Sequence, residues 1–131
     1  MASELRVNTL KDASGNNSVA TSVVASGSAK SWINFTGVST TAIRDSFNIS
    51  SITDESTGKT YPIAMTSAMA NDDYAGSYFQ MGAPGTGRTN FNNNYAGGLG
   101  DKTTTQFGTV SFADAVIDSG MNDVIIVGDL A

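Results

Sequence analysis

The chain has 131 residues, which is the size of a single domain, and it carries a net charge of −5. It contains neither cysteine nor histidine, so its own side chains cannot form disulfide bonds, thiolate metal sites or imidazole-based catalytic groups. The negative charge disfavours nucleic acid as a partner, because it repels the phosphate backbone. Hydrophobic residues make up 40% of the sequence, which favours a folded core over a disordered chain.

The residue types favour β-structure throughout. Serine, threonine, asparagine and glycine are abundant, whereas strong helix formers are scarce, and no window predicts a long amphipathic helix. The longest apolar run, at residues 124–127, is too short to span a bilayer, and residues 1–4 do not resemble a signal peptide. We therefore expect a soluble all-β protein that does not enter a membrane.

Residues 1–28 differ from the rest of the chain. A short strand-like alternation precedes a turn at residues 12–17, and small or β-branched residues fill 19–27. This stretch is too slender to form its own core, so we predict an extended N-terminal arm for attachment or subunit exchange. Such an arm would become ordered on binding, by adding a strand to an exposed sheet edge. Its predicted attachment residues are Leu5, Val7, Leu10, Val19, Val23 and Val24.

Residues 29–131 contain short strand patterns separated by turn residues. Residues 54–59 predict a hairpin turn, and Pro62 is expected to start a strand or to lie in an edge strand, because it cannot donate to a ladder. The pattern indicates an all-β head, a β-sandwich or jelly-roll-like fold. The predicted strands are 32–36, 42–49 with a continuation through 51–53, 61–66, 74–81, 103–113 and 123–127.

Residues 82–100 are rich in glycine and asparagine and predict a long exposed loop. Arg88, Phe91 and Tyr95 are its candidate contact residues. The tyrosines and asparagines of this region suit contact with a glycan and suit a seam between subunits equally well. Trp32, the only tryptophan, is expected to anchor the core or an interface rather than to stack on a sugar.

Residues 82–89 come close to the phosphate-binding pattern G-x-x-x-x-G-K-[ST]. Arg88 stands where that pattern needs lysine, Asn90 and the residues after it begin a helix poorly, and the chain offers no crossover helices. We therefore expect no bound nucleotide and no cofactor. The acidic pairs at 54–55 and 72–73 match no calcium-loop pattern, so they are interpreted as solvated turn residues rather than as a metal site.

Two central stretches, 29–37 (AKSWINFTG) and 42–54 (AIRDSFNISSITD), resemble the repeated core of fibre-type proteins of tailed phages, notably marine and cyanobacterial ones. Residues 4–17 are similar to the leader that often precedes that core, and 123–130 resemble its last strand. The resemblance implies a virion surface protein, commonly trimeric, with an N-terminal attachment segment and a β-rich head. It brings no functional residue with it.

The expected function is therefore non-enzymatic. We predict a structural protein of the phage virion surface, most of all a capsid knob or decoration protein, because one leader and one head leave no room for a shaft. Its partners would be other virion proteins and two further copies of itself in a homotrimer. The alternative is a short tail fibre or receptor-binding tip that contacts host surface glycans. A carbohydrate-binding module is a hypothesis from a different functional class, and it would need a platform of exposed aromatic residues.

Overall fold

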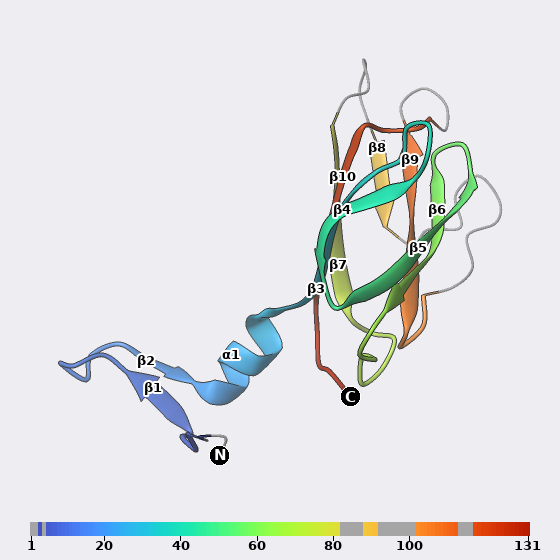
Figure 1. The fold of residues 1–131 in the computed structure, drawn as a ribbon. Coiled ribbons are helices and arrows are strands. Elements are labelled where there is room, and N and C mark those ends of the chain that lie inside the picture. Colours follow the sequence, from blue (N-terminus) through green and yellow to red (C-terminus); the bar gives the residue numbers. More distant parts are fainter. Residues whose placement is uncertain (1–2, 4, 82–87, 92–101, 113–116) are drawn as a thin grey trace.

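The computed structural model of the chain describes all residues except 1–2, 4, 82–87, 92–101 and 113–116. Almost all of its regular structure is β-strand, so the prediction of an all-β protein is confirmed. Figure 1 shows a β-sandwich head and a narrow arm that projects from it.

Two sheets of four antiparallel strands make up the head in the part of the chain that is described. The first sheet has the order β4 (Ala42–Phe47), β3 (Ala29–Thr36), β10 (Met121–Val127) and β7 (Ala75–Met81). The second has the order β5 (Ile49–Ser56), β6 (Lys59–Met65), β9 (Gln106–Phe112) and β8 (Arg88–Phe91). The hairpin predicted at residues 54–59 joins β5 to β6.

The hydrophobic core lies between the two sheets. In β3 and β10 every second residue is buried, as expected for strands that pack on one face only. Ile33, Phe35, Val124 and Ile126 meet Phe107 of the second sheet, and all five are at most 1% exposed. Burying a side chain of this size stabilises the fold by about 1.5–3 kcal/mol.

Asn48 turns the chain from the first sheet to the second, so the predicted single strand over 42–49 and beyond is wrong. Its backbone is left-handed (φ 58°), a conformation that asparagine tolerates better than most residues. Its side-chain amide donates hydrogen bonds to the Lys30 and Ser67 carbonyls, and its Oδ1 accepts one from the Ser67 N–H at 2.7 Å. The corner places the two large residues beside it differently: Phe47 is exposed, whereas Ile49 packs against the core.

Pro62 lies inside β6, a central strand of the second sheet, which contradicts its predicted place at a strand start or sheet edge. In the pairing of β6 with β5, and also with β9, the register is irregular between Thr60 and Ile63, so Pro62 is not among the paired residues. A proline is tolerated at such an irregularity because no ladder hydrogen bond is required of it. The Tyr61–Pro62 peptide bond is cis.

The stretch 82–100 is not a continuous loop, because it contains β8. Residues 88–91 pair with β9 from Phe112 to Thr109 and complete the second sheet. The high asparagine and glycine content therefore led to a predicted loop that was too long. The stretches on either side of β8, 82–87 and 92–100, lie outside the described residues.

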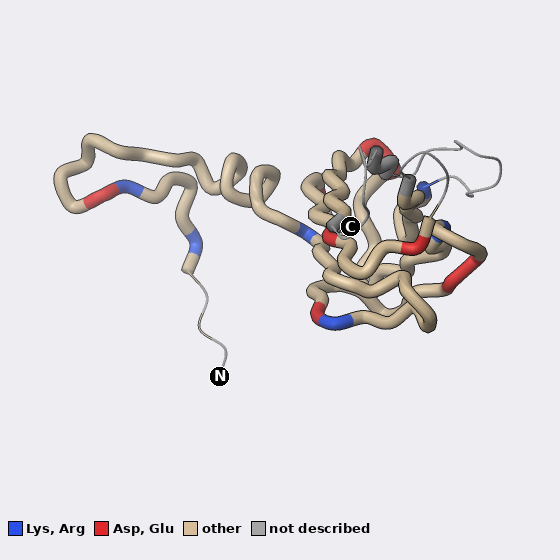
Figure 2. The backbone as a smooth tube through the Cα atoms, turned by 90° about the horizontal axis from the view of Figure 1, so that it is seen from above, with Lys and Arg blue, Asp and Glu red and all other residues tan. Residues whose placement is uncertain are grey.

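The arm consists of a hairpin, β1 (Thr9–Lys11) with β2 (Ser18–Ala20), and a short helix, α1 (Thr21–Gly27). The predicted turn at 12–17 joins the two strands. The helix corrects the expected extended conformation: its residues are small, and in a segment without a neighbouring strand a helix satisfies backbone groups locally. In Figures 1 and 2 the arm extends away from the head.

Candidate functional site

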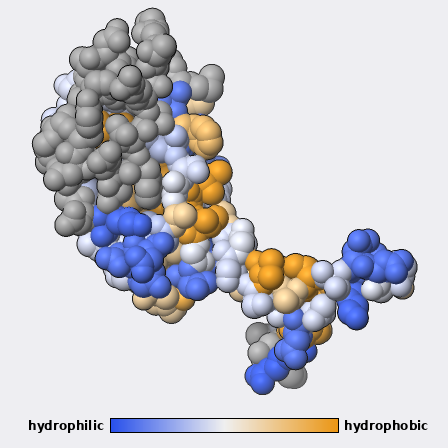
Figure 3. Space-filling view, turned by 180° about the vertical axis from the view of Figure 1, so that it is seen from behind, coloured by the Kyte–Doolittle hydropathy of each residue, from blue (hydrophilic) through white to orange (hydrophobic). Residues whose placement is uncertain are grey.

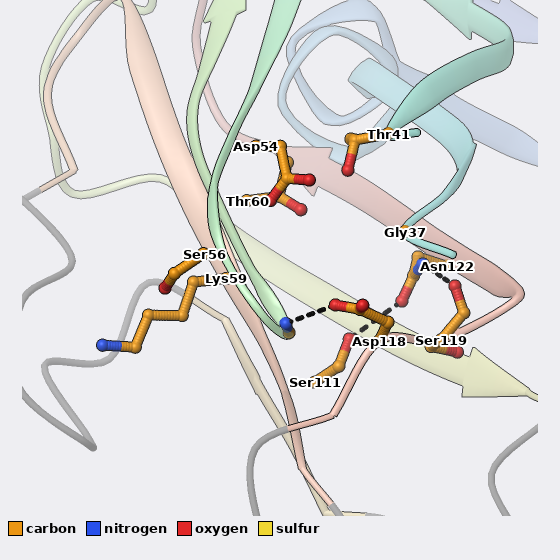
Figure 4. Close-up of a pocket in the computed structure, with 11 residues that line it drawn as sticks. Gly37, Thr41, Asp54, Ser56, Lys59, Thr60, Ser111, Asp118, Ser119 and Asn122 are labelled. Carbon is orange, nitrogen blue, oxygen red and sulfur yellow. Dashed lines mark hydrogen bonds between the residues drawn. The ribbon is translucent and has the colours of Figure 1, made fainter. Parts of the chain in front are cut away.

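Figure 4 shows a polar cleft between the two sheets, near the β5–β6 hairpin and the start of β10. The cleft is too narrow to admit a water molecule. Its lining comes from both sheets and from the segment before β10 and consists of Gly37, Thr41, Asp54, Ser56, Gly58, Lys59, Thr60, Ser111, Asp118, Ser119 and Asn122.

Asn122, which is 1% exposed, is at the centre of the hydrogen bonds beside this cleft. Its Oδ1 accepts hydrogen bonds from the hydroxyls of Tyr78 and Ser111. Its Nδ2 donates to the carbonyls of Ser119 at 3.0 Å and Phe35 at 3.4 Å. Burial raises the pKa of Tyr78 to about 12, so its hydroxyl remains a neutral donor at physiological pH. A satisfied network of this kind fixes the packing of the two sheets.

The carboxylate of Asp118 also has a structural role. It accepts a hydrogen bond from the Gly58 backbone N–H at 2.7 Å and so ties the β5–β6 hairpin to the segment that precedes β10. No group of three or more Asp or Glu side chains in the described residues is arranged to hold a metal ion. Of the acidic pairs considered from the sequence, Asp72 and Asp73 are exposed, and Asp54 lines the cleft while Glu55 is exposed.

A second surface is the outward side of the first sheet, which we call the outer face: Trp32, Asn34, Asp45, Phe47, Ser77, Phe79, Asp123 and Ile125. The strand registers place Trp32 between Phe47 on β4 and Ile125 on β10, in one row across three strands. Phe47 is 52% exposed, Ile125 46% and Phe79 59%. Figure 3 shows hydrophobic surface on the side of the head that faces the arm.

Polar groups occupy the next row of the outer face. The registers pair Asn34 with Asp45 on one side and with Asp123 on the other, and the Asn34 amide donates a hydrogen bond to the Asp123 carboxylate. A shallow groove of about 370 Å³ runs between β3 and β10, lined by these two residues and by Trp32 and Ile125. Across β4, β3 and β10 the outer face is therefore apolar in one row and acidic in the next, and on β7 Ser77 ends the apolar row while Phe79 ends the acidic one.

The predicted attachment residues all lie on the arm and are all exposed. The hairpin pairs Leu10 with Val19, and α1, which buries no residue, carries Val23 and Val24. Leu5 is 81% exposed. Figure 3 shows a second hydrophobic area on the arm. The arm thus presents an apolar surface that its own chain does not cover.

The three contact residues predicted for the loop at 82–100 are not shown to share a loop. Arg88 and Phe91 are the first and last residues of β8, so they belong to a strand rather than a loop, and Tyr95 lies outside the described residues. Trp32 is not a core residue, since it lies half-buried on the outer face.

Sequence reasoning missed Ile125 and Phe79 on the outer face and the Tyr78–Ser111–Asn122 network. The spacing of two residues between Asp123 and Ile125 places both side chains on the same face of the strand, and this was the signal that could have placed Ile125 outward.

Comparison with protein-family models, with curated proteins and with solved structures finds no match to this chain. In the described part of the chain, no helix is both long enough and apolar enough to cross a membrane.

Proposed function

We propose that the chain is a non-enzymatic structural protein on the surface of a tailed-phage particle, most of all a capsid knob or decoration protein. The arm attaches the molecule and the head faces outward. The observation that carries the proposal is the contrast between a complete core and an uncovered arm: every residue of the core cluster lies between positions 33 and 126, whereas the arm leaves its apolar residues exposed.

The character of the polar cleft supports an assembly role over a catalytic one. Catalysis needs reactive groups with room for a substrate beside them. The cleft does not admit a water molecule, and its best-placed groups, Asn122 and Asp118, are engaged with the protein's own donors and acceptors. The accessible features are instead apolar surfaces, which are typical of contacts with other proteins.

A short tail fibre or receptor-binding tip is the second candidate. The half-buried indole of Trp32 lies beside the Asn34 amide and the Asp123 carboxylate, and an aromatic ring with neighbouring polar groups suits a sugar. A glycan array separates the two candidates. A tip would retain specific glycans through Trp32 and lose them in Trp32→Ala, whereas a decoration protein would retain none.

The proposed function is tested by adding the purified chain back to particles that lack it. We expect the full chain to restore decoration in a cryo-EM map and the chain of residues 29–131 to leave the sites empty. Thr53→Ala, a change on the exposed surface of β5 in the second sheet, is the matched control and should decorate normally. Equal occupancy by the full and shortened chains would show that the arm is not the anchor.

A further inference from the structure

Building on the proposed role of the arm, we infer that the outer face of one copy is the acceptor for the arm of a second copy. The occupant is therefore another molecule of this chain, and it binds through its β1–β2 hairpin and α1. Three properties of the two surfaces support this pairing: their apolar character, the direction in which the arm leaves the head, and their charges.

The outer face has the geometry of an acceptor. Trp32 is flanked by Phe47 and Ile125 in one row, and the groove between β3 and β10 passes directly beside it. Phe79 on β7 adds a further exposed aromatic ring, at the end of the row that contains Asp123. Large aromatic and aliphatic side chains around a shallow groove are the usual anchors of a protein interface. These groups belong to four rigid, paired strands, so binding needs little rearrangement of the head.

The arm has the matching geometry of a donor. Leu10 and Val19 are paired across the hairpin, and Val23 and Val24 follow within the next turn of chain. These four residues give the arm a narrow apolar surface, and the arm itself consists only of a hairpin and a short helix. A two-stranded hairpin is marginally stable alone, so the arm gains stability when a larger surface covers it.

The arm is directed away from its own head. The Lys30 ammonium hydrogen-bonds the Ala25 carbonyl and the Ser28 hydroxyl, and the Ser28 N–H donates to the Val24 carbonyl at 3.1 Å. These bonds hold α1 beside the start of β3, and the hairpin projects away from the head instead of lying along the first sheet of the same chain (Figures 1 and 2). A second copy is therefore better placed to receive it.

The charges of the two surfaces are complementary. The outer face carries the carboxylates of Asp45 and Asp123, whereas the hairpin carries Lys11. Asp12, next to Lys11, is occupied within its own turn: it accepts hydrogen bonds from Ser14 at 2.9 Å and from the Asn17 side chain at 2.7 Å. Lys11 can therefore pair with the acidic row, whereas the Asp12 carboxylate keeps its charge but is held within its own turn.

Because the chain has no cysteine, the contact can be mapped with single introduced thiols. Leu10→Cys is placed on the arm of one tagged chain, and Ser77→Cys on the outer face of a second, differently tagged chain. Thr53→Cys, exposed on the other sheet, is the control acceptor. After mixing and mild oxidation, we expect the Leu10→Cys chain to cross-link to Ser77→Cys about tenfold or more above Thr53→Cys.

Equal yields at the two acceptor positions would overturn the inference. So would a chain carrying both Leu10→Cys and Ser77→Cys that cross-links only within itself at high dilution, because its own arm would then cover the face.

An independent measurement uses the single tryptophan. If an arm covers Trp32, its fluorescence should shift to the blue as the concentration of the full chain rises, in step with association in analytical ultracentrifugation. Ile125→Asp should weaken association about tenfold or more, while Thr53→Asp should leave it unchanged. A full chain that stays monomeric up to its solubility limit contradicts the inference. The proposed function still stands in that case if the chain decorates particles only when it carries the arm. If the chain decorates particles without the arm, the proposed function is wrong instead.

Discussion

The arm and the head distribute the same kinds of residue in opposite ways. In the head, large apolar side chains such as Phe107 and Ile126 are buried between two sheets, and the polar Asn122 among them has partners for both ends of its amide. In the arm, Leu10 and Val23 lie on the surface of a thin element that buries nothing in its helix. The head covers its large apolar side chains with its own contacts, whereas the arm leaves its apolar side chains uncovered. Under the proposed function, folding and assembly belong to different segments of the chain.

The largest difference between the regions is expected in the effect of removing apolar side chains. Phe107→Ala empties a site that is 0% exposed and should lower the free energy of unfolding by about 3–5 kcal/mol. The matched change in the arm, Leu10→Ala, should lower it by less than about 0.5 kcal/mol at concentrations where the chain is monomeric. Denaturant unfolding measures both. Comparable losses would mean that the arm packs into the cooperative unit of the head.

The corner at Asn48 tests how the two sheets are joined. Asn48→Ala loses the side-chain hydrogen bonds to Lys30 and Ser67 and places alanine in a left-handed conformation, so we expect a loss of about 2–3 kcal/mol. Asn48→Gly loses the same hydrogen bonds but adopts the conformation freely, and should be about 1 kcal/mol less harmful than alanine. If the two variants are equally stable, the backbone conformation is not what constrains the corner.

The buried network predicts a dependence on alkaline pH. Because the folded-state pKa of Tyr78 is about 12, above the ordinary value of 10, the folded protein retains a proton that the unfolded chain releases. Its contribution is fully present below pH 10 and is lost as pH rises to 12, by up to about 3 kcal/mol. Tyr78→Phe should reduce this slope in pH-dependent unfolding. It should not abolish the slope, because burial, with a smaller effect of the Asp72 charge, also raises the pKa of Tyr74 to about 12. An unchanged slope would contradict the burial of the Tyr78 hydroxyl in a neutral network.

The sequence was sufficient for the class of fold and for most strands, because short runs of β-branched and aromatic residues lie between turn residues. In β3 and β10 every second residue is buried, as packing on one face requires. The places where it failed depend on tertiary structure. A single left-handed residue, Asn48, divides an apparently continuous strand, and an irregular register lets Pro62 enter a central strand. The helix at α1 forms where no neighbouring strand competes for the backbone, which no local pattern reports.

The candidate surfaces were predictable in part. The arm residues could be chosen because a stretch of small apolar side chains without a large partner cannot bury itself. The outer face could not, because the row formed by Phe47, Trp32 and Ile125 depends on the pairing of three strands that are distant in the sequence. Residues that meet only through strand register leave no contiguous motif.

Removal of the arm is expected to have the smallest effect on stability and the largest effect on assembly. Removing residues 1–28 should change the free energy of unfolding of the head by less than about 0.5 kcal/mol, because the core cluster lies entirely within residues 33–126. The comparison is made at low concentration, since association would itself stabilise the full chain.

Sedimentation of the full chain beside the chain of residues 29–131 tests the division of roles most directly. We expect the full chain to form a closed oligomer, a trimer if the resemblance to phage fibres holds, and the shortened chain to be a folded monomer at every concentration. A shortened chain that still associates like the full chain, or that no longer folds, would contradict the separation of a self-sufficient head from an arm made for assembly.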